Sequence, residues 1–143
     1  MVAVAATVWA CGGDSGGTTG VQPPTNTQPT GNFDISTINA KALPVAIFAD
    51  TGGYTYEVMS GTLALTSDGK YSAKINYRQT LLGKVDLFTD STGGTWALSG
   101  TQVTFTNGQD ASTDKADWVS STGKLTFVES QGSASNTYVY TKK

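Results

Sequence analysis

The sequence predicts an all-β fold: an antiparallel up-and-down meander of about eight or nine strands that closes into a small barrel or curls into a half-barrel. Two observations predict it. Only 14% of the 143 residues are charged, against about 25% in an average soluble domain, and Gly, Ser and Thr replace them. Short runs rich in Val, Ile, Thr, Tyr and Trp alternate with turn residues about every 8–12 positions. Because every connection is short, successive strands are expected to be antiparallel neighbours.

The N-terminus has the pattern of a secretory signal. Residues 2–10 are all apolar or small and lead directly to the only cysteine, Cys11. The stretch is too short to cross a bilayer as a helix, which takes about 20 residues, but it has the length of a signal's apolar part. A signal also begins with positive charge, and the first cation here is Lys41. We therefore expect residues 1–10 to be a truncated signal peptide whose basic start lies upstream.

The last four residues of this stretch, Val8-Trp9-Ala10-Cys11, resemble the lipobox of bacterial lipoproteins, although Trp9 stands where a small or polar residue is usual. The resemblance implies that Cys11 becomes the first residue, is diacylated through sulfur and anchors the chain in a membrane. The absence of Asp after the cysteine favours the outer membrane of a bacterial cell envelope. The alternative is a cysteine buried in an N-terminal strand.

The next segment is expected to be a tether. From residue 12 to residue 32 the chain reads "GGDSGGTTGVQPPTNTQPTGN", with Val21 as its only large apolar residue. Such a segment cannot bury enough surface to offset the entropy of ordering it. The expected organisation is a lipidated Cys with a flexible tether over residues 11–35 and a barrel domain over residues 36–143.

Alternation of apolar and polar residues sets the expected strands. They cover residues 42–49, 54–66, 70–80, 82–89, 94–99, 102–107, 115–121, 124–130 and 136–142. Pro44 is expected at the start of the first run or on a sheet edge, since proline cannot donate to a ladder. The apolar phase flips between Val58 and Met59, which predicts a β-bulge where the sheet bends.

Three hairpins have turn residues that fix a register. A three-residue loop at 67–69 pairs Leu65 with Tyr71, Leu63 with Ala73, Gly61 with Ile75 and Met59 with Tyr77. A two-residue loop at 100–101 pairs Leu98 with Val103 and Trp96 with Phe105. A loop at 122–123 pairs Trp118 with Phe127. In each hairpin the bulky side chains share one face. In the first hairpin, Lys70, Lys74 and Arg78 lie on the opposite, polar face.

Several segments together resemble the small lipocalin-like domain of bacterial lipoproteins: "ALPVAIFAD", "SGTLALTSDGKYS", "GGTWALSGTQVTF", "GKLTF" and "YVY". The resemblance covers residues 42–142 and implies a lipocalin-like barrel. The Gly-X-Trp of larger secreted lipocalins lies near their first strand, whereas Trp96 lies in the middle of this chain. The resemblance therefore indicates the fold and names no ligand.

Composition excludes several kinds of chemistry. The chain has no histidine, the commonest general base and transition-metal ligand, and no cluster of cations that would bind nucleic acid. Carboxylates gather as Asp86 with Asp90 and as Asp110 with Asp114 and Asp117. They are interpreted as turn-forming and solubilising groups, since no calcium-loop spacing supports a weak metal site. We expect no enzyme, no cofactor and no metal.

Binding is the better candidate, because an eight-stranded barrel is just wide enough to be filled by side chains or to hold one small ligand. The candidate ligand-lining or core residues are Tyr71, Ile75, Tyr77, Trp96, Leu98, Phe105, Trp118 and Phe127. Two readings stay open. One is a membrane-tethered module for a small apolar or amphipathic molecule. The other is a structural or interaction lipoprotein whose barrel is filled. Arg78 is expected in solvent, paired with Glu57.

Overall fold

The computed structural model describes residues 27–131 and 134–143. The expected signal peptide, Cys11 and most of the expected tether lie outside these residues. The described part forms ten strands and has no helix, so none that could span a bilayer. They are β1 (Gly31–Ile38), β2 (Lys41–Ala42), β3 (Val45–Ala49), β4 (Tyr54–Leu65), β5 (Lys70–Leu81), β6 (Lys84–Ser99), β7 (Gln102–Asn107), β8 (Thr113–Val119), β9 (Lys124–Gln131) and β10 (Ala134–Lys142).

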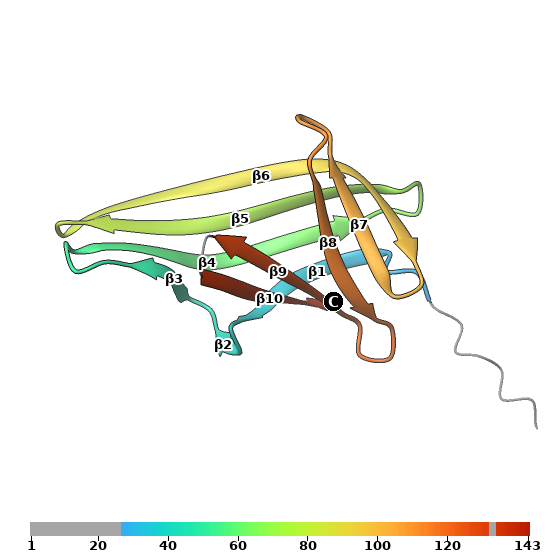
Figure 1. Cartoon of the computed structure of the whole chain (residues 1–143), viewed down its shortest axis with the longest axis horizontal. Helices are drawn as coiled ribbons and strands as arrows, with labels where there is room; N and C mark the ends of the chain where they lie inside the picture. Colours follow the sequence, from blue (N-terminus) through green and yellow to red (C-terminus); the bar gives the residue numbers. More distant parts are fainter. Residues whose placement is uncertain (1–26, 132–133) are drawn as a thin grey trace, which may run out of the picture.

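The strands form one antiparallel sheet that closes into an eight-stranded barrel, as the sequence predicts. Strands β4 to β10 follow one another as a meander, and β1 pairs with β10 on one side and β4 on the other. The short strands β2 and β3 extend the sheet outside this circuit (Figure 1). Pro44 immediately precedes β3, which lies at the sheet edge, as expected for a residue without an N–H.

Strand β1 corrects the expected end of the tether at residue 35, because residues 31–35 belong to the barrel. Phe33 is fully buried and Ile35 almost so. The register of β1 on β10 shifts between Ile35 and Thr37, so that Ile38 is buried as well. The Lys143 ammonium lies 3.0 Å from the Asp34 carboxylate beside this pairing. Strand β1 therefore supplies the eighth wall and closes the barrel.

The β4–β5 hairpin has the expected register over most of its length. Leu65 pairs with Tyr71, Leu63 with Ala73 and Gly61 with Ile75. The expected bulge lies at Met59, where the register shifts between Val58 and Ser60. Its consequence differs from the prediction in one pair, because Tyr77 lies opposite Val58 and not Met59.

The β6–β7 hairpin confirms the pairs Trp96–Phe105 and Leu98–Val103 around the loop at 100–101. The expected break between strands 82–89 and 94–99 is wrong, since β6 runs unbroken over 16 residues. Gly94 allows this continuity at a close approach: a Cβ there would lie 2.0 Å from the Thr106 carbonyl oxygen. The glycine pair at 93–94 thus bends one strand instead of separating two.

The β8–β9 hairpin corrects the third predicted register. Trp118 pairs with Leu125, and Phe127 pairs with Ala116, so the connection has four residues, 120–123, and not two. A hydrogen bond from the Thr122 N–H to the Val119 carbonyl closes its turn at 3.2 Å. The slip is two residues, which keeps the same side chains on the inner face.

The packed core includes residues of the neighbouring strands β7 and β8 at one end of the barrel (Figure 1). Trp118 is 2% exposed, its indole N–H donates to the Thr27 carbonyl at 2.7 Å, and its ring meets Phe33 edge-on at 5.9 Å. Trp96 is 9% exposed and donates to the Thr66 carbonyl at 3.1 Å. Both indole rings are therefore buried in the core, and the N–H group of each has a hydrogen-bond acceptor.

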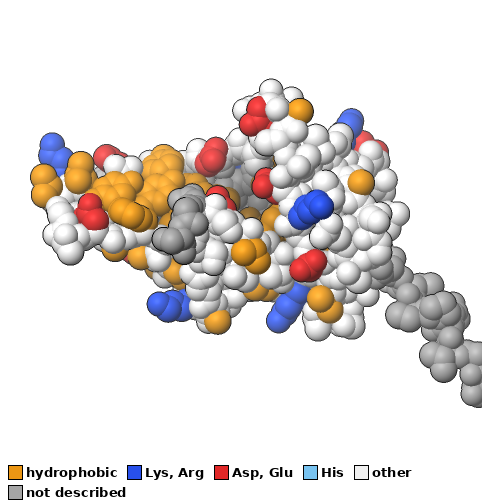
Figure 2. Space-filling view, in the orientation of Figure 1, with side chains coloured by type: hydrophobic (Ala, Val, Ile, Leu, Met, Phe, Trp, Pro, Cys, Tyr) orange, Lys and Arg blue, Asp and Glu red, His pale blue; other side chains and the backbone are white. Residues whose placement is uncertain are grey.

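The opposite end of the sheet projects from the barrel. Strands β4, β5 and β6 continue well past the ends of β9 and β10, with β3 along their edge (Figure 1). Hydrophobic side chains gather on this projection (Figure 2). On its inner face the rings of Tyr56, Tyr77 and Phe88 stack together, with the Tyr56 and Tyr77 centroids 4.9 Å apart.

Candidate ligand-binding cavity

A gap in the pairing leaves one side of the barrel open. Strand β6 pairs with β7 only over residues 94–99, and the β8–β9 ladder ends at the pair between Ala116 and Phe127. Asp90 and Thr92 of β6 and Val128 and Glu129 of β9 therefore line the same space, and no strand of the described part of the chain pairs between them. A cavity of about 350 Å³ lies behind this gap.

The apolar wall of the cavity comes from strands β5, β9 and β10. Its members are Tyr71, Ile75, Tyr77, Phe127, Tyr138 and Tyr140. Behind them the rings form a continuous packed floor: Phe105 lies 5.1 Å from Tyr71 and 5.1 Å from Phe127, and Phe127 lies 5.3 Å from Tyr140. These contacts hold the rings of Tyr71, Phe127 and Tyr140 in one packed layer that also borders the cavity.

The rim of the cavity is polar and mostly negative. Asp90 from β6, Asp114 from β8 and Glu129 from β9 contribute three carboxylates, and Lys115 contributes the one ammonium group among the lining residues. Acidic side chains are visible near the middle of the face in Figure 2, beside the hydrophobic patch. The arrangement places negative charge above an aromatic surface.

Titration of the tyrosines reflects this environment. Burial, with smaller contributions from the charges of Tyr56, Asp90 and Glu129, raises the pKa of Tyr77 to about 12. Burial is also the main cause of the raised pKa of Tyr138, with the Glu129 carboxylate contributing through its charge and a hydrogen bond. The hydroxyls of Tyr77 and Tyr138 are therefore neutral at physiological pH.

The structure divides the candidate residues named from the sequence. Tyr71, Ile75, Tyr77 and Phe127 line the cavity. Those outside its lining are Trp96, Leu98, Phe105 and Trp118; Leu98 is half-buried, and the other three belong to the buried core.

Nine lining residues were not among the named candidates: Tyr138, Tyr140, Val128, Thr92, Asn107, Lys115, Asp90, Asp114 and Glu129. The alternation of Tyr138 and Tyr140 carried a usable signal, since it places both on the inner face. The carboxylates carried none, because nothing local distinguishes an acidic residue at a cavity rim from one in a solvated turn.

The other acidic groups behave as turn and surface residues. The Asp110 carboxylate accepts hydrogen bonds from the Ser112 N–H at 2.9 Å and hydroxyl at 2.7 Å. Arg78 donates to both oxygens of Glu57, at 2.6 and 2.9 Å, which confirms that expected pair. The described residues contain no group of three or more His, Cys, Asp or Glu side chains placed to hold a metal ion.

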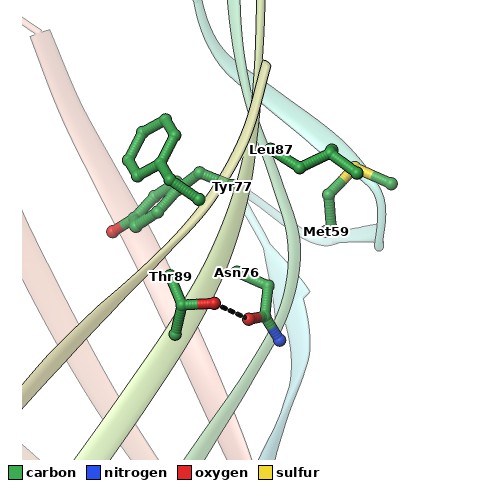
Figure 3. Close-up of a pocket in the computed structure, with 6 residues that line it drawn as sticks. Met59, Asn76, Tyr77, Leu87 and Thr89 are labelled. Carbon is green, nitrogen blue, oxygen red and sulfur yellow. Dashed lines mark hydrogen bonds between the residues drawn. The ribbon is translucent and has the colours of Figure 1, made fainter. Parts of the chain in front are cut away.

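A second hollow, of about 310 Å³, lies on the projection beside Met59, Asn76 and Leu87. Figure 3 shows Met59 and Leu87 on the side of the sheet away from the Tyr77 ring. The Thr89 hydroxyl donates to the Asn76 side-chain oxygen at 2.6 Å across the floor of this hollow. Its position on a sheet surface makes it a weaker ligand site than the aromatic cavity.

Comparison with known proteins adds no identity to this geometry. No family model, curated protein or solved structure matches the chain. The eight-stranded antiparallel barrel is compatible with a lipocalin-like fold, and the cavity itself is the basis for a functional assignment.

Proposed function

We propose that this protein is an envelope lipoprotein whose barrel binds a small amphipathic molecule bearing a positive charge. The carrying observation is the cavity between β5–β6 and β9–β10, where aromatic walls meet three carboxylates. Its volume of about 350 Å³ falls within the roughly 300–1,000 Å³ usual for small-molecule sites.

The chemistry of the lining selects the ligand class. The apolar or aromatic body of a ligand would lie on the rings of Tyr71, Phe127 and Tyr140, burying surface on both sides. A cation would lie at the rim, where Asp114 and Glu129 attract it and tyrosine faces add a cation–π contribution. The same carboxylates would repel an anionic amphiphile.

The experiment compares two fluorescent dyes of opposite charge. Cationic thioflavin T is expected to give a saturable one-to-one signal with the full chain, and anionic ANS a much weaker one. Asp114→Asn removes a rim carboxylate and should weaken thioflavin T binding several-fold. Asp117→Asn is the matched control, since it makes the same charge change on the same strand but on the outer face.

Two results would reject the cavity as a binding site. One is the absence of a saturable signal with either dye. The other is equal weakening by Asp114→Asn and Asp117→Asn, which would mean that overall charge and not the cavity governs binding.

Membrane attachment is the second part of the proposal and rests on the Val8-Trp9-Ala10-Cys11 sequence. Two or more acyl chains on Cys11 would hold the protein stably on a membrane, where one would give only marginal binding. The chain, expressed in bacteria behind a complete signal peptide, should incorporate labelled palmitate. Cys11→Ala should abolish labelling and release the protein from the membrane fraction; unchanged labelling would contradict the assignment.

A further inference from the structure

The outer edge of β6 is an unpaired strand. Residues 84–92 pair with β5 on one side and with no strand on the other within the described part of the chain. Every one of these nine residues is exposed, on both faces of the sheet. Leu87 is 74% exposed and Val85 57%. Proline, bulges and covering structure often protect such edges, and this edge has none of them in its regular pairing with β5; its protecting features are charged side chains, Lys84, Asp86 and Asp90.

The direction of the backbone groups along this edge follows from the turn. The two-residue loop at Leu82 and Gly83 has positive φ at both positions, 49° and 81°, as in a type I′ turn. Lys84 therefore exchanges hydrogen bonds with Leu81, and the N–H and C=O groups of Val85, Leu87 and Thr89 point away from β5. Three consecutive donor–acceptor sets thus face solvent.

The far end of the strand agrees with this assignment. Gly93 lies six residues after Leu87, so the backbone groups of both residues point to the same side of β6. The Gly93 carbonyl accepts a hydrogen bond from the Gly108 N–H at 2.9 Å, on the side away from β5. The free edge is therefore the direct continuation of the edge that β7 occupies further along.

We infer that two copies of this chain associate through their β6 edges, as antiparallel strands centred on Leu87. In this register Leu87 lies opposite its own copy, and their backbone groups exchange two hydrogen bonds. Val85 of each copy lies opposite Thr89 of the other, so the outward-pointing N–H and C=O groups of these residues are also paired. The arrangement is isologous, so each contact occurs twice.

Charge complementarity selects this register. With Leu87 at the centre, Lys84 of each copy lies directly opposite Asp90 of the other, in positions where side chains approach closely. Neither residue forms an ion pair within residues 27–131 and 134–143. A centre one residue later, at Phe88, would instead place Asp86 opposite Asp90 twice, with repulsion in both places.

The shape of the molecule leaves room for this pairing. Strands β5 and β6 project past β9 and β10, so the tip is open to a second strand (Figure 1). The strands run in opposite directions, so the second barrel would lie beyond the tip of the first. Leu87 adjoins the hollow beside Met59 (Figure 3), and the partner's apolar side chains would extend over this face.

The test uses charge swaps in the full chain, kept reduced so that Cys11 cannot cross-link it. Sedimentation equilibrium of the wild type should show a concentration-dependent dimer. Lys84→Asp and Asp90→Lys should each weaken self-association at least tenfold, because each brings like charges together. An equimolar mixture of the two variants should dimerise again, since both ion pairs form in the heterodimer.

A second pair of variants tests the backbone. Leu87→Pro removes an N–H that points away from β5, so β5–β6 pairing survives, which far-UV circular dichroism can verify. Leu87→Ser loses the apolar side chain but keeps the donor. The inference requires weaker association for the proline variant than for the serine variant.

The following outcomes overturn the inference: a wild type that stays monomeric at millimolar concentration, charge variants that associate like the wild type, or a mixture that does not recover. A chain that stays monomeric but binds phosphatidylcholine vesicles, and loses this with Leu82→Ser, would also overturn it and assign the tip to a lipid surface. None of these readouts involves a ligand in the aromatic cavity.

Discussion

The closure of the barrel by β1 makes a sharp prediction at Gly61. A Cβ at this position would lie 2.2 Å from Cδ1 and 2.8 Å from Cγ1 of Ile35, which β1 presents across the β1–β4 junction. Gly61→Ala therefore overfills the junction, at a cost of about 1–3 kcal/mol. The gain from replacing a strand glycine, about 0.5–1 kcal/mol, offsets part of this cost. We expect a net loss of unfolding free energy of up to about 2.5 kcal/mol.

A double-mutant cycle isolates the contact. Ile35→Ala alone should cost about 2–5 kcal/mol, as for other buried isoleucines. In the double variant the new methyl group enters the space that Ile35 vacates, so the combined loss should be smaller than the sum by about 1 kcal/mol or more. Urea unfolding followed by tryptophan fluorescence and circular dichroism gives all four free energies.

Gly52→Ala provides the control cycle. Its Cβ would make only ordinary contacts with Asp50, 3.4 Å away at the nearest, and nothing links it to Ile35. Its effect should add to that of Ile35→Ala within about 0.5 kcal/mol. If Gly61→Ala is equally additive, Ile35 does not lie on Gly61, and the closure of the barrel by β1 is wrong.

Three further predictions concern the bend in β6, the core and the tyrosines. Gly94→Ala should lower the unfolding free energy by about 3 kcal/mol or more, because the new Cβ meets two backbone atoms, the Thr106 oxygen and the Gly108 nitrogen, at 2.0 and 2.8 Å; a change below 1 kcal/mol would contradict the bend. Trp118→Ala should cost about 3–5 kcal/mol and Trp118→Phe about 1–2 kcal/mol, because Phe keeps most of the packed ring but loses the hydrogen bond to the Thr27 carbonyl; an unchanged urea-unfolding free energy in Trp118→Phe would show that the hydrogen bond contributes nothing. Burial raises the pKa of Tyr77 to about 12 and also raises the pKa of Tyr140. Above pH 10 the unfolded chain therefore releases phenolic protons that the folded chain retains, so the unfolding free energy should fall as pH rises from 10 to 12, and less steeply in Tyr77→Phe; identical slopes would contradict the raised pKa.

Local pattern was sufficient to predict the hairpins whose turn residues specify a register. In β4–β5 and β6–β7, alternation limits the pairing to registers that put the bulky side chains inside, and glycine at positive φ in the turn selects one of these registers. In β8–β9 the alternation fits loops of two and four residues equally well. Both place Trp118 and Phe127 on the same face, and sequence alternation cannot separate registers that differ by two.

Strand β1 and the cavity depend on contacts that no local pattern carries. The run from Phe33 to Ile38 alternates for only three residues before its register shifts, and its partners β4 and β10 are joined to it by no tight turn. Likewise the carboxylates of Asp90, Asp114 and Glu129 come from three strands. Only the closed sheet brings them to one rim.

The most direct test of the account is whether the space behind the β6–β9 gap is hollow. Ile75 lines this space and is half-buried, so Ile75→Trp would extend a large ring into it. If the space is hollow, Ile75→Trp should keep the unfolding free energy within about 1 kcal/mol of the wild type and should abolish thioflavin T binding. A loss of more than about 2 kcal/mol would show that the interior is already filled, and would contradict the cavity.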